Sequence, residues 1–239
     1  FCLELSTGKK LWESSAPKGS FEGAAAFSGD LVIAGCTDSF VYTWNAETGL
    51  PNWKFETQGE IHAAVNIWTD PATKQDRVLI GSYDNFIYSL DAKDGKKLWA
   101  VETGNYINGG CAVSPDGKIA LGGCDAVLHI LEASTGKVLW KFAYATAYQD
   151  ALGKGDGPRS TPVVAGDKLI TLGAEGTLHC LTLADGKKVW SQSLTKEYKT
   201  PLGYFGISTS PVVEDNLVLI NVGGSKAGIV AFDLASGKE

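Results

Sequence analysis

The chain has 239 residues, of which 44% are hydrophobic and 20% charged, and its formal net charge is −6. A chain of this length and composition can bury a sizeable apolar core, and all-β chains of this size often form a single domain. The acidic balance, with no Lys/Arg run longer than two residues, argues against a nucleic-acid partner. No apolar run approaches the roughly 18 residues that a membrane-spanning helix needs.

A short turn phrase recurs along the whole chain. It reads LSTGKKLW near the start, then AETGLPNW, AKDGKKLW, ASTGKVLW and LADGKKVW. Its glycines lie 41 to 51 residues apart, and in five copies a tryptophan follows four residues later. The glycines are Gly8, Gly49, Gly95, Gly136, Gly186 and Gly237, and the tryptophans are Trp12, Trp53, Trp99, Trp140 and Trp190. A period of about 45 residues indicates a repeat architecture.

In chain order, each period contains four short runs with the composition of β-strands. In the stretch 60–102 an opening run, IHAAVNI, is followed by RVLIGS, FIYSLD and KKLWAV, with the turns YDN and AKDG between the last three. Helical spacing is sustained nowhere. We therefore expect an all-β fold, a β-propeller of four-stranded antiparallel blades. Full blades are expected at 20–56, 60–102, 106–143 and 158–194, with partial blades at 1–15 and 206–239, in one domain over 1–239.

The repeated turn and its tryptophan have a structural explanation. The glycine is expected to take the left-handed conformation that closes a bulged hairpin between the third and outermost strands. The tryptophan on the outermost strand is then expected to pack on the neighbouring blade. A cofactor-stacking role is disfavoured, because one ligand cannot reach the outer strand of every blade. Trp68, in the irregular insertion IWTDPATKQD, is expected on a loop and should contribute much less to stability than Trp99.

Other chemistry-bearing residues also favour structural interpretations. His129 and His179 have no second ligand at metal spacing and are expected to pack beneath the sheet. Asp38, Asp84 and Asp125 are expected to cap the turns between second and third strands. The five cysteines contain no adjacent or C-x-x-C pair, so small buried thiols are favoured over disulfides.

The phrase [D/E/N]-x-x-[T/D/S]-G-K-x-x-W resembles the pyrroloquinoline-quinone (PQQ) type propeller repeat. This repeat is shared by quinoprotein alcohol dehydrogenases, by the propeller lipoprotein of the outer-membrane β-barrel assembly machinery, and by secreted or kinase-attached bacterial propellers. The resemblance implies a ring of seven or eight blades. The sequence would supply four full and two partial blades of that ring, so we expect an open arc. The resemblance also implies a periplasmic or extracellular location.

Candidate binding residues lie where each outer strand leads to the next inner strand. Aligning the units places five polar side chains at one shared position at the mouth of the channel: Glu22, His62, Asn108, Arg159 and Ser208. Two of these connections, 144–159 and 196–206, are longer than the others, and long loops in a repeat protein often carry function. Their aromatic residues are expected to anchor a partner: Tyr144, Tyr148, Tyr204 and Phe205. Solvated strand ends without a ligand are the alternative interpretation.

Three functions remain open at this point. The favoured one is a non-catalytic propeller that binds a protein or a polysaccharide through its channel face, with no cofactor. The first alternative is part of a PQQ-dependent dehydrogenase, which the resemblance would associate with Ca²⁺, a channel tryptophan and a disulfide of adjacent cysteines. The sequence has no adjacent cysteine pair, and Glu22 is its channel-mouth carboxylate. The second alternative is the extracytoplasmic sensor domain of a kinase.

Overall fold

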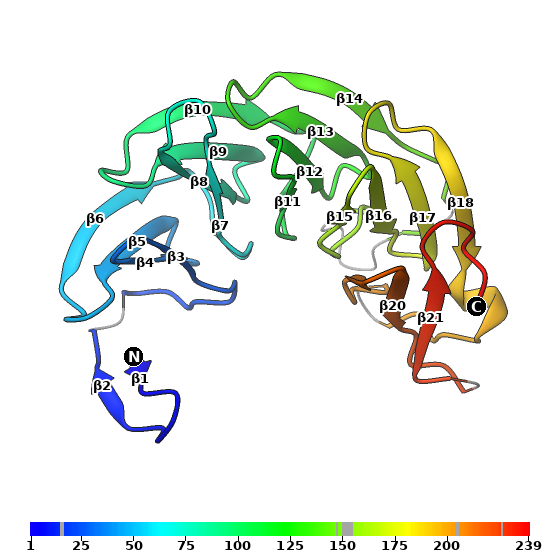
Figure 1. Cartoon of the computed structure of the whole chain (residues 1–239), viewed down its shortest axis with the longest axis horizontal. Helices are drawn as coiled ribbons and strands as arrows, with labels where there is room; N and C mark the ends of the chain where they lie inside the picture. Colours follow the sequence, from blue (N-terminus) through cyan, green and yellow to red (C-terminus); the bar gives the residue numbers. More distant parts are fainter. Residues whose placement is uncertain (15–16, 147, 150–154, 204–205, 226) are drawn as a thin grey trace.

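The computed structural model describes residues 1–14, 17–146, 148–149, 155–203, 206–225 and 227–239. In Figure 1 the sheets follow one another around a common centre and form an open arc, with the two termini at its ends. Four of these sheets have four strands each, in sequential antiparallel order. This arrangement confirms the predicted all-β propeller.

Each full blade runs from an inner strand near the centre to an outer strand at the rim (Figure 1). The first two full blades are β3 (Ala26–Ser28), β4 (Leu31–Gly35), β5 (Phe40–Asn45) and β6 (Pro51–Glu56), then β7 (Asn66–Thr69), β8 (Asp76–Gly81), β9 (Phe86–Asp91) and β10 (Lys97–Glu102). The next two are β11 (Ala112–Val113), β12 (Lys118–Gly122), β13 (Leu128–Glu132) and β14 (Val138–Phe142), then β15 (Val163–Ala165), β16 (Lys168–Leu172), β17 (Thr177–Thr182) and β18 (Lys188–Ser193).

Smaller sheets lie at the two ends of the arc. The remaining elements are β1 (Cys2–Leu3) and β2 (Lys10–Trp12) at the amino-terminal end, and α1 (Leu194–Glu197), β19 (Val212–Glu214), β20 (Leu217–Asn221) and β21 (Ile229–Asp233) at the other. None of the helical segments in the described parts of the chain has the length and apolar character needed to cross a membrane.

The recurring tryptophan joins each blade to the next. In all five copies the indole nitrogen donates a hydrogen bond to a backbone carbonyl in the turn of the following blade. The pairs are Trp12 to Ala46 (2.8 Å), Trp53 to Ala92 (2.9 Å), Trp99 to Ala133 (3.0 Å), Trp140 to Leu183 (3.1 Å) and Trp190 to Leu234 (3.0 Å). The predicted blade-to-blade role of these five residues is therefore confirmed.

The turn glycine meets two requirements at once. Gly95 has a φ of 74°, a conformation that L side chains rarely adopt. A Cβ at this position would also lie 2.5 Å from the ring of Trp53. The same two conditions recur at Gly49, Gly136, Gly186 and Gly237, each beneath the indole of the preceding blade. Glycine is thus required both by the turn and by the indole that covers it.

Substitution of Gly95 by alanine should separate these two requirements. We expect Gly95→Ala to lower the free energy of unfolding by about 2–3 kcal/mol, from backbone strain together with displacement of the indole. Gly29→Ala is the matched control, because Gly29 has a φ of 56° and open space around its Cβ position. That variant should lose only about 1 kcal/mol. Equal losses in urea denaturation would show that the indole contact contributes nothing.

The apolar core lies between neighbouring blades. Ile33, Ile61 and Ile80 are fully or almost fully buried and belong to one cluster that joins the first two full blades. In the first two full blades the end of the second strand is closely approached by the following blade: a Cβ at Gly35 would lie 2.3 Å from a methyl carbon of Ile61. A Cβ at Gly81 would lie 2.2 Å from the equivalent carbon of Ile107. Adjacent blades are therefore packed as tightly at the inner side as at the rim.

The prediction for Trp68 was wrong. Trp68 lies in the inner strand β7, is only 6% exposed, and belongs to the apolar cluster between the second and third full blades. A Cβ at Gly117 would lie 2.7 Å from its ring, and the guanidinium of Arg77 lies over it at 5.6 Å. The irregular insertion begins after this strand, in the loop between β7 and β8. Trp68 is therefore a second contact between blades.

Candidate functional site

The five aligned polar residues occupy equivalent places in the structure. Each lies four residues before the first residue of an inner strand, in the segment that leads into β3, β7, β11, β15 or β19. These entry segments run side by side: a Cβ at Gly23 would lie 2.3 Å from the carbonyl oxygen of Ala63, and one at Gly109 would lie 3.1 Å from that of Arg159. The sequence alignment of the blades therefore places these positions correctly, although they precede the strands.

His62 is held between two carboxylates. Its Nδ1 lies 2.8 Å from a carboxylate oxygen of Glu22, on the preceding blade, and its Nε2 lies 2.9 Å from one of Glu60. Both carboxylates are exposed, whereas the imidazole is half-buried. With both nitrogens occupied, the ring has a fixed orientation and links two blades.

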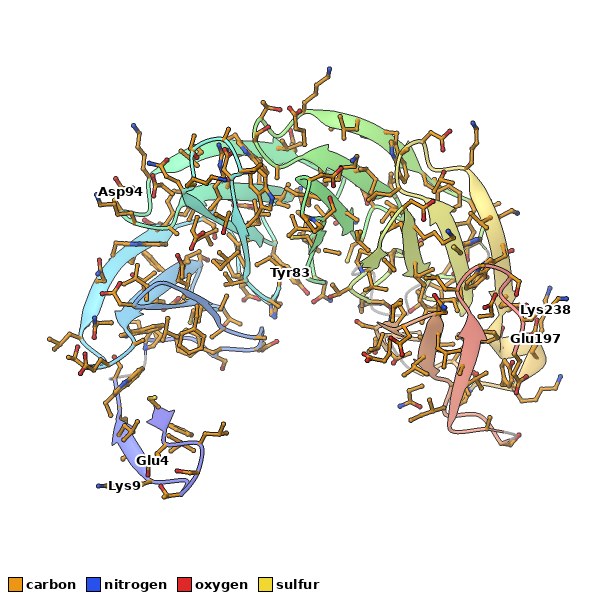
Figure 2. The ribbon with its side chains drawn as sticks, in the orientation of Figure 1. Glu4, Lys9, Tyr83, Asp94, Glu197 and Lys238 are labelled. Atoms are coloured by element: carbon orange, nitrogen blue, oxygen red, sulfur yellow. The ribbon has the colours of Figure 1, made fainter. Side chains whose placement is uncertain are left out.

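An aromatic row continues from His62 along the wall of the channel. The ring of Tyr83, in the turn between β8 and β9, lies 4.2 Å from that of His62. Tyr106, in the segment before β11, stacks on Tyr83 at 4.9 Å with an interplanar angle of 13°. Figure 2 shows Tyr83 on the inner side of the arc. We call Glu22, Glu60, His62, Tyr83 and Tyr106 the channel cluster.

Charges of both signs surround the phenol of Tyr83. Burial raises the pKa of Tyr83 to about 12, and neighbouring Cys124, Glu60 and Glu22 act in the same direction. The guanidinium of Arg159 opposes this effect, which places its positive charge near the same ring. Tyr83 is therefore a neutral hydrogen-bonding group at physiological pH, with both acidic and basic side chains near enough to influence it.

Three members of the channel cluster were missed in the sequence. Glu60 and Tyr106 stand two residues before the aligned position, and Tyr83 follows the second strand of its blade. The residues equivalent to Tyr83 in the first and third full blades are Thr37 and Cys124, which are both small. A large aromatic side chain at this position in only one of these three blades was therefore the sequence signal that could have identified Tyr83. Asn108 is half-buried, and Ser208 is exposed.

Two of the predicted loop aromatics, Tyr144 and Tyr148, lie outside the channel cluster. The hydroxyl of Tyr144 donates to a carboxylate oxygen of Glu175 at 2.6 Å, and its ring lies 4.5 Å from that of His179. Tyr144 and Tyr148 line a separate groove beside β18 and α1. Tyr204 and Phe205 lie outside the described residues. As binding residues, these four remain predictions.

The turn aspartates have the predicted capping role and a further one. Oδ1 of Asp84 accepts a hydrogen bond from the backbone nitrogen of Phe86 at 3.0 Å, and Asp38 and Asp125 make the same kind of contact. The other oxygen bonds the side chain four residues later, on the third strand. These pairs are Asp38 with Tyr42 (2.9 Å), Asp84 with Tyr88 (2.7 Å) and Asp125 with His129 (2.7 Å).

The residues of the channel do not fit a calcium–quinone site. The described parts of the chain contain no group of three His, Cys, Asp or Glu side chains placed to hold a metal ion. All five cysteines are free thiols, and none is adjacent to another in the sequence. The two tryptophans outside the repeated phrase, Trp44 and Trp68, are buried in strands β5 and β7. The two carboxylates of the channel cluster, Glu22 and Glu60, each lie within hydrogen-bond distance of a ring nitrogen of His62.

Comparison with known proteins gives two kinds of similarity. The family model described as outer membrane protein assembly factor BamB matches residues 2–129 and 125–239. A crystal structure of BamB from Moraxella catarrhalis superposes with a TM-score of 0.68 and 18% sequence identity, over 92% of this chain and 61% of that one. At this identity the superposition supports the fold alone.

Similarity to enzymes is shorter. A quinoprotein ethanol dehydrogenase from Pseudomonas putida and the quinoprotein alcohol dehydrogenase PedE from Pseudomonas putida strain KT2440 are each 33% identical over 66 residues. These matches cover 28% of this chain but only 11% and 10% of the two enzymes. The chain therefore shares a short stretch of repeat with these enzymes.

Proposed function

This chain belongs to the family of the outer membrane protein assembly factor BamB, and we propose that it is a non-catalytic propeller that binds a polypeptide through the channel cluster. The observation that carries the proposal is the row of three rings formed by His62, Tyr83 and Tyr106. Aromatic side chains are enriched at binding hot spots because they bury a large area with few rotatable bonds. The row spans two blades, so it offers an extended platform.

The charges around the row favour a polypeptide. An extended peptide presents amide groups and side chains of both signs, which match the carboxylates of Glu22 and Glu60 and the guanidinium of Arg159. Oriented charges of this kind contribute more to specificity and association rate than to affinity. Family membership further supports a protein partner and a periplasmic location.

Paired substitutions test the proposed binding face. Tyr83→Ala combined with Tyr106→Ala should abolish capture of the partner polypeptide from an extract of the source organism, with little loss of melting temperature. Lys96→Ala combined with Lys97→Ala is the control on the turns of the rim, and it should leave capture intact. Photo-crosslinking from position 106 should recover the same polypeptide. If the lysine pair abolishes capture instead, the binding face has been assigned to the wrong part of the molecule.

The short match to quinoprotein dehydrogenases supports a second candidate, in which the chain is part of such an enzyme. We expect it to fail a direct test. Titration with PQQ and Ca²⁺, followed by absorbance, should show no saturable binding, and dye-linked alcohol oxidation should stay at background. Stoichiometric binding with turnover would contradict the non-catalytic proposal.

A further inference from the structure

Asn108 is followed by a glycine, unlike every other asparagine in the chain. It occupies the aligned position at the channel mouth in the segment that leads into β11. Asparagine is among the thermally labile residues of proteins, because a backbone nitrogen can attack its side-chain amide. A following glycine has no Cβ to obstruct that attack. In a folded chain the reaction also requires that both reacting groups are free.

The attacking group is unrestrained in this structure. The backbone N–H of Gly109 donates no hydrogen bond within the described parts of the chain. The glycines of three Asp-Gly turns are different: Gly95, Gly117 and Gly186 each donate their N–H to a backbone carbonyl at 2.9 Å. An amide bonded in this way must lose its hydrogen bond before its nitrogen can attack another group. The nitrogen of Gly109 has no such bond to lose.

The side-chain amide of Asn108 is also unrestrained. It makes no hydrogen bond among the described residues, and the residue is half-buried, so water can reach it. Other asparagines are held by the backbone. Oδ1 of Asn45 accepts a hydrogen bond from the nitrogen of Thr48 at 2.9 Å. Oδ1 of Asn105 accepts one from the nitrogen of Tyr106 at 2.8 Å.

We propose that Asn108 is a deamidation site of the folded protein. The nitrogen of Gly109 loses its proton and forms a bond to the side-chain carbonyl carbon of Asn108, which closes a cyclic succinimide. The bond from that carbon to the side-chain nitrogen breaks, and this nitrogen leaves with the proton as ammonia. Water then opens the ring at either carbonyl and gives aspartate or isoaspartate. The reaction consumes water and needs no oxidant or reductant.

Deamidation changes the channel mouth in two ways. Either product adds one negative charge to a chain of formal net charge −6, at a position aligned with Glu22. Isoaspartate also adds a carbon to the main chain where two blades meet. A Cβ at Gly109 would lie 3.1 Å from the carbonyl oxygen of Arg159, and the N–H of the next residue donates to Oγ1 of Thr161 at 3.2 Å. The reaction is independent of the proposed polypeptide binding.

Incubation of the folded 239-residue chain in mildly alkaline buffer, followed by proteolysis and mass spectrometry, tests the proposal. The peptide that contains Asn108 should gain the mass difference between an amide and a carboxyl group, at a rate that rises with hydroxide concentration. An isoaspartate methyltransferase should label the same peptide. Because a misplaced reacting atom costs about a hundredfold in rate, the folded chain should react within about tenfold of the urea-unfolded chain. Stronger protection in the folded chain would overturn the proposal.

Asp94→Asn is the matched control. It places the same dipeptide in a turn where the N–H of Gly95 donates to the carbonyl of Asp91 at 2.9 Å. In the folded chain this site should react at least about tenfold more slowly than Asn108, and in urea the two rates should converge. Equal rates at the two sites in the folded chain would show that the free N–H does not select Asn108, and would overturn the proposal.

Two glycine variants separate the attacking nitrogen from the packing around it. Gly109→Ala places a Cβ beside that nitrogen and should slow the reaction at least about tenfold. Gly110→Ala makes a similarly close contact, at 3.2 Å from Oγ1 of Thr161, but should keep the rate of the unmodified chain. The effect of Gly109→Ala should persist in urea, so a folding defect would not hide it. An unchanged rate for Gly109→Ala in urea would refute attack by this nitrogen.

Discussion

Replacing Trp99 with alanine should lower the free energy of unfolding by about 3–5 kcal/mol, as truncation of large aromatic side chains in cores does. The indole donates to Ala133 at 3.0 Å and its ring covers Gly136 on the next blade. Trp68→Ala should cost a similar amount, because Trp68 is 6% exposed and packs on Gly117. Denaturant unfolding of the two variants measures both values.

The variant Trp99→Phe distinguishes the contribution of apolar packing from that of the indole hydrogen bond. Phenylalanine keeps most of the apolar area but has no donor, so we expect a loss of about 1–2 kcal/mol. A loss below about 1 kcal/mol for Trp99→Ala would show that the repeated tryptophan does not join the blades. A nearly neutral Trp68→Ala would contradict the burial of that residue.

The second large effect is a loss of folding stability at acidic pH, caused by the buried side chain of His179. Burial lowers the pKa of His179 from 6.5 to about 4, and Lys188 adds to this effect, although the carboxylate of Glu175 opposes it. Between these two values the unfolded chain binds a proton that the folded chain does not. The contribution of His179 to stability is therefore fully present above pH 6.5 and is lost as the pH falls towards 4. We expect a loss of about 2 kcal/mol over this interval, allowing for solvent screening.

Two homologous histidines provide the comparison. His179→Phe should flatten the pH dependence of stability between pH 6.5 and 4, because its ring can fill the space between Phe142 and Tyr144 without taking up a proton. His129→Gln should leave this acid dependence in place, but it should lower stability at pH 7, since His129 is bonded to Asp125. The role assigned to His179 would be refuted if His179→Phe kept the full acid dependence in denaturation series at fixed pH values.

The blades and their contacts could be predicted from the sequence because both are periodic. The spacing of glycine and tryptophan is repeated in every unit, so one physical argument about a turn and an indole applied throughout the chain. The error at Trp68 arose where the period is interrupted. A strand of four residues followed by an insertion could not be distinguished from the insertion itself.

The channel cluster could be predicted only in part. Alignment of the units placed Glu22 and His62 correctly, but their hydrogen bond joins residues 40 positions apart on different blades. The stack of Tyr83 on Tyr106 likewise depends on how a turn of one blade faces the entry segment of the next. Contacts of this kind follow from the angle between blades, which no single unit of sequence contains.

The five indole hydrogen bonds all point in the same direction along the chain, and this affects the order in which the blades can be completed. Every indole finds its carbonyl 34 to 44 residues further along the chain, never behind it. A blade that has just left the ribosome therefore lacks its outer contact for about 2–9 s, the time needed to synthesise that many residues at 5–20 per second. During this interval its indole is exposed on a rim that only the next unit can cover. In synthesis or export, both of which run from the amino terminus, each unit would therefore complete the outer contact of the unit before it.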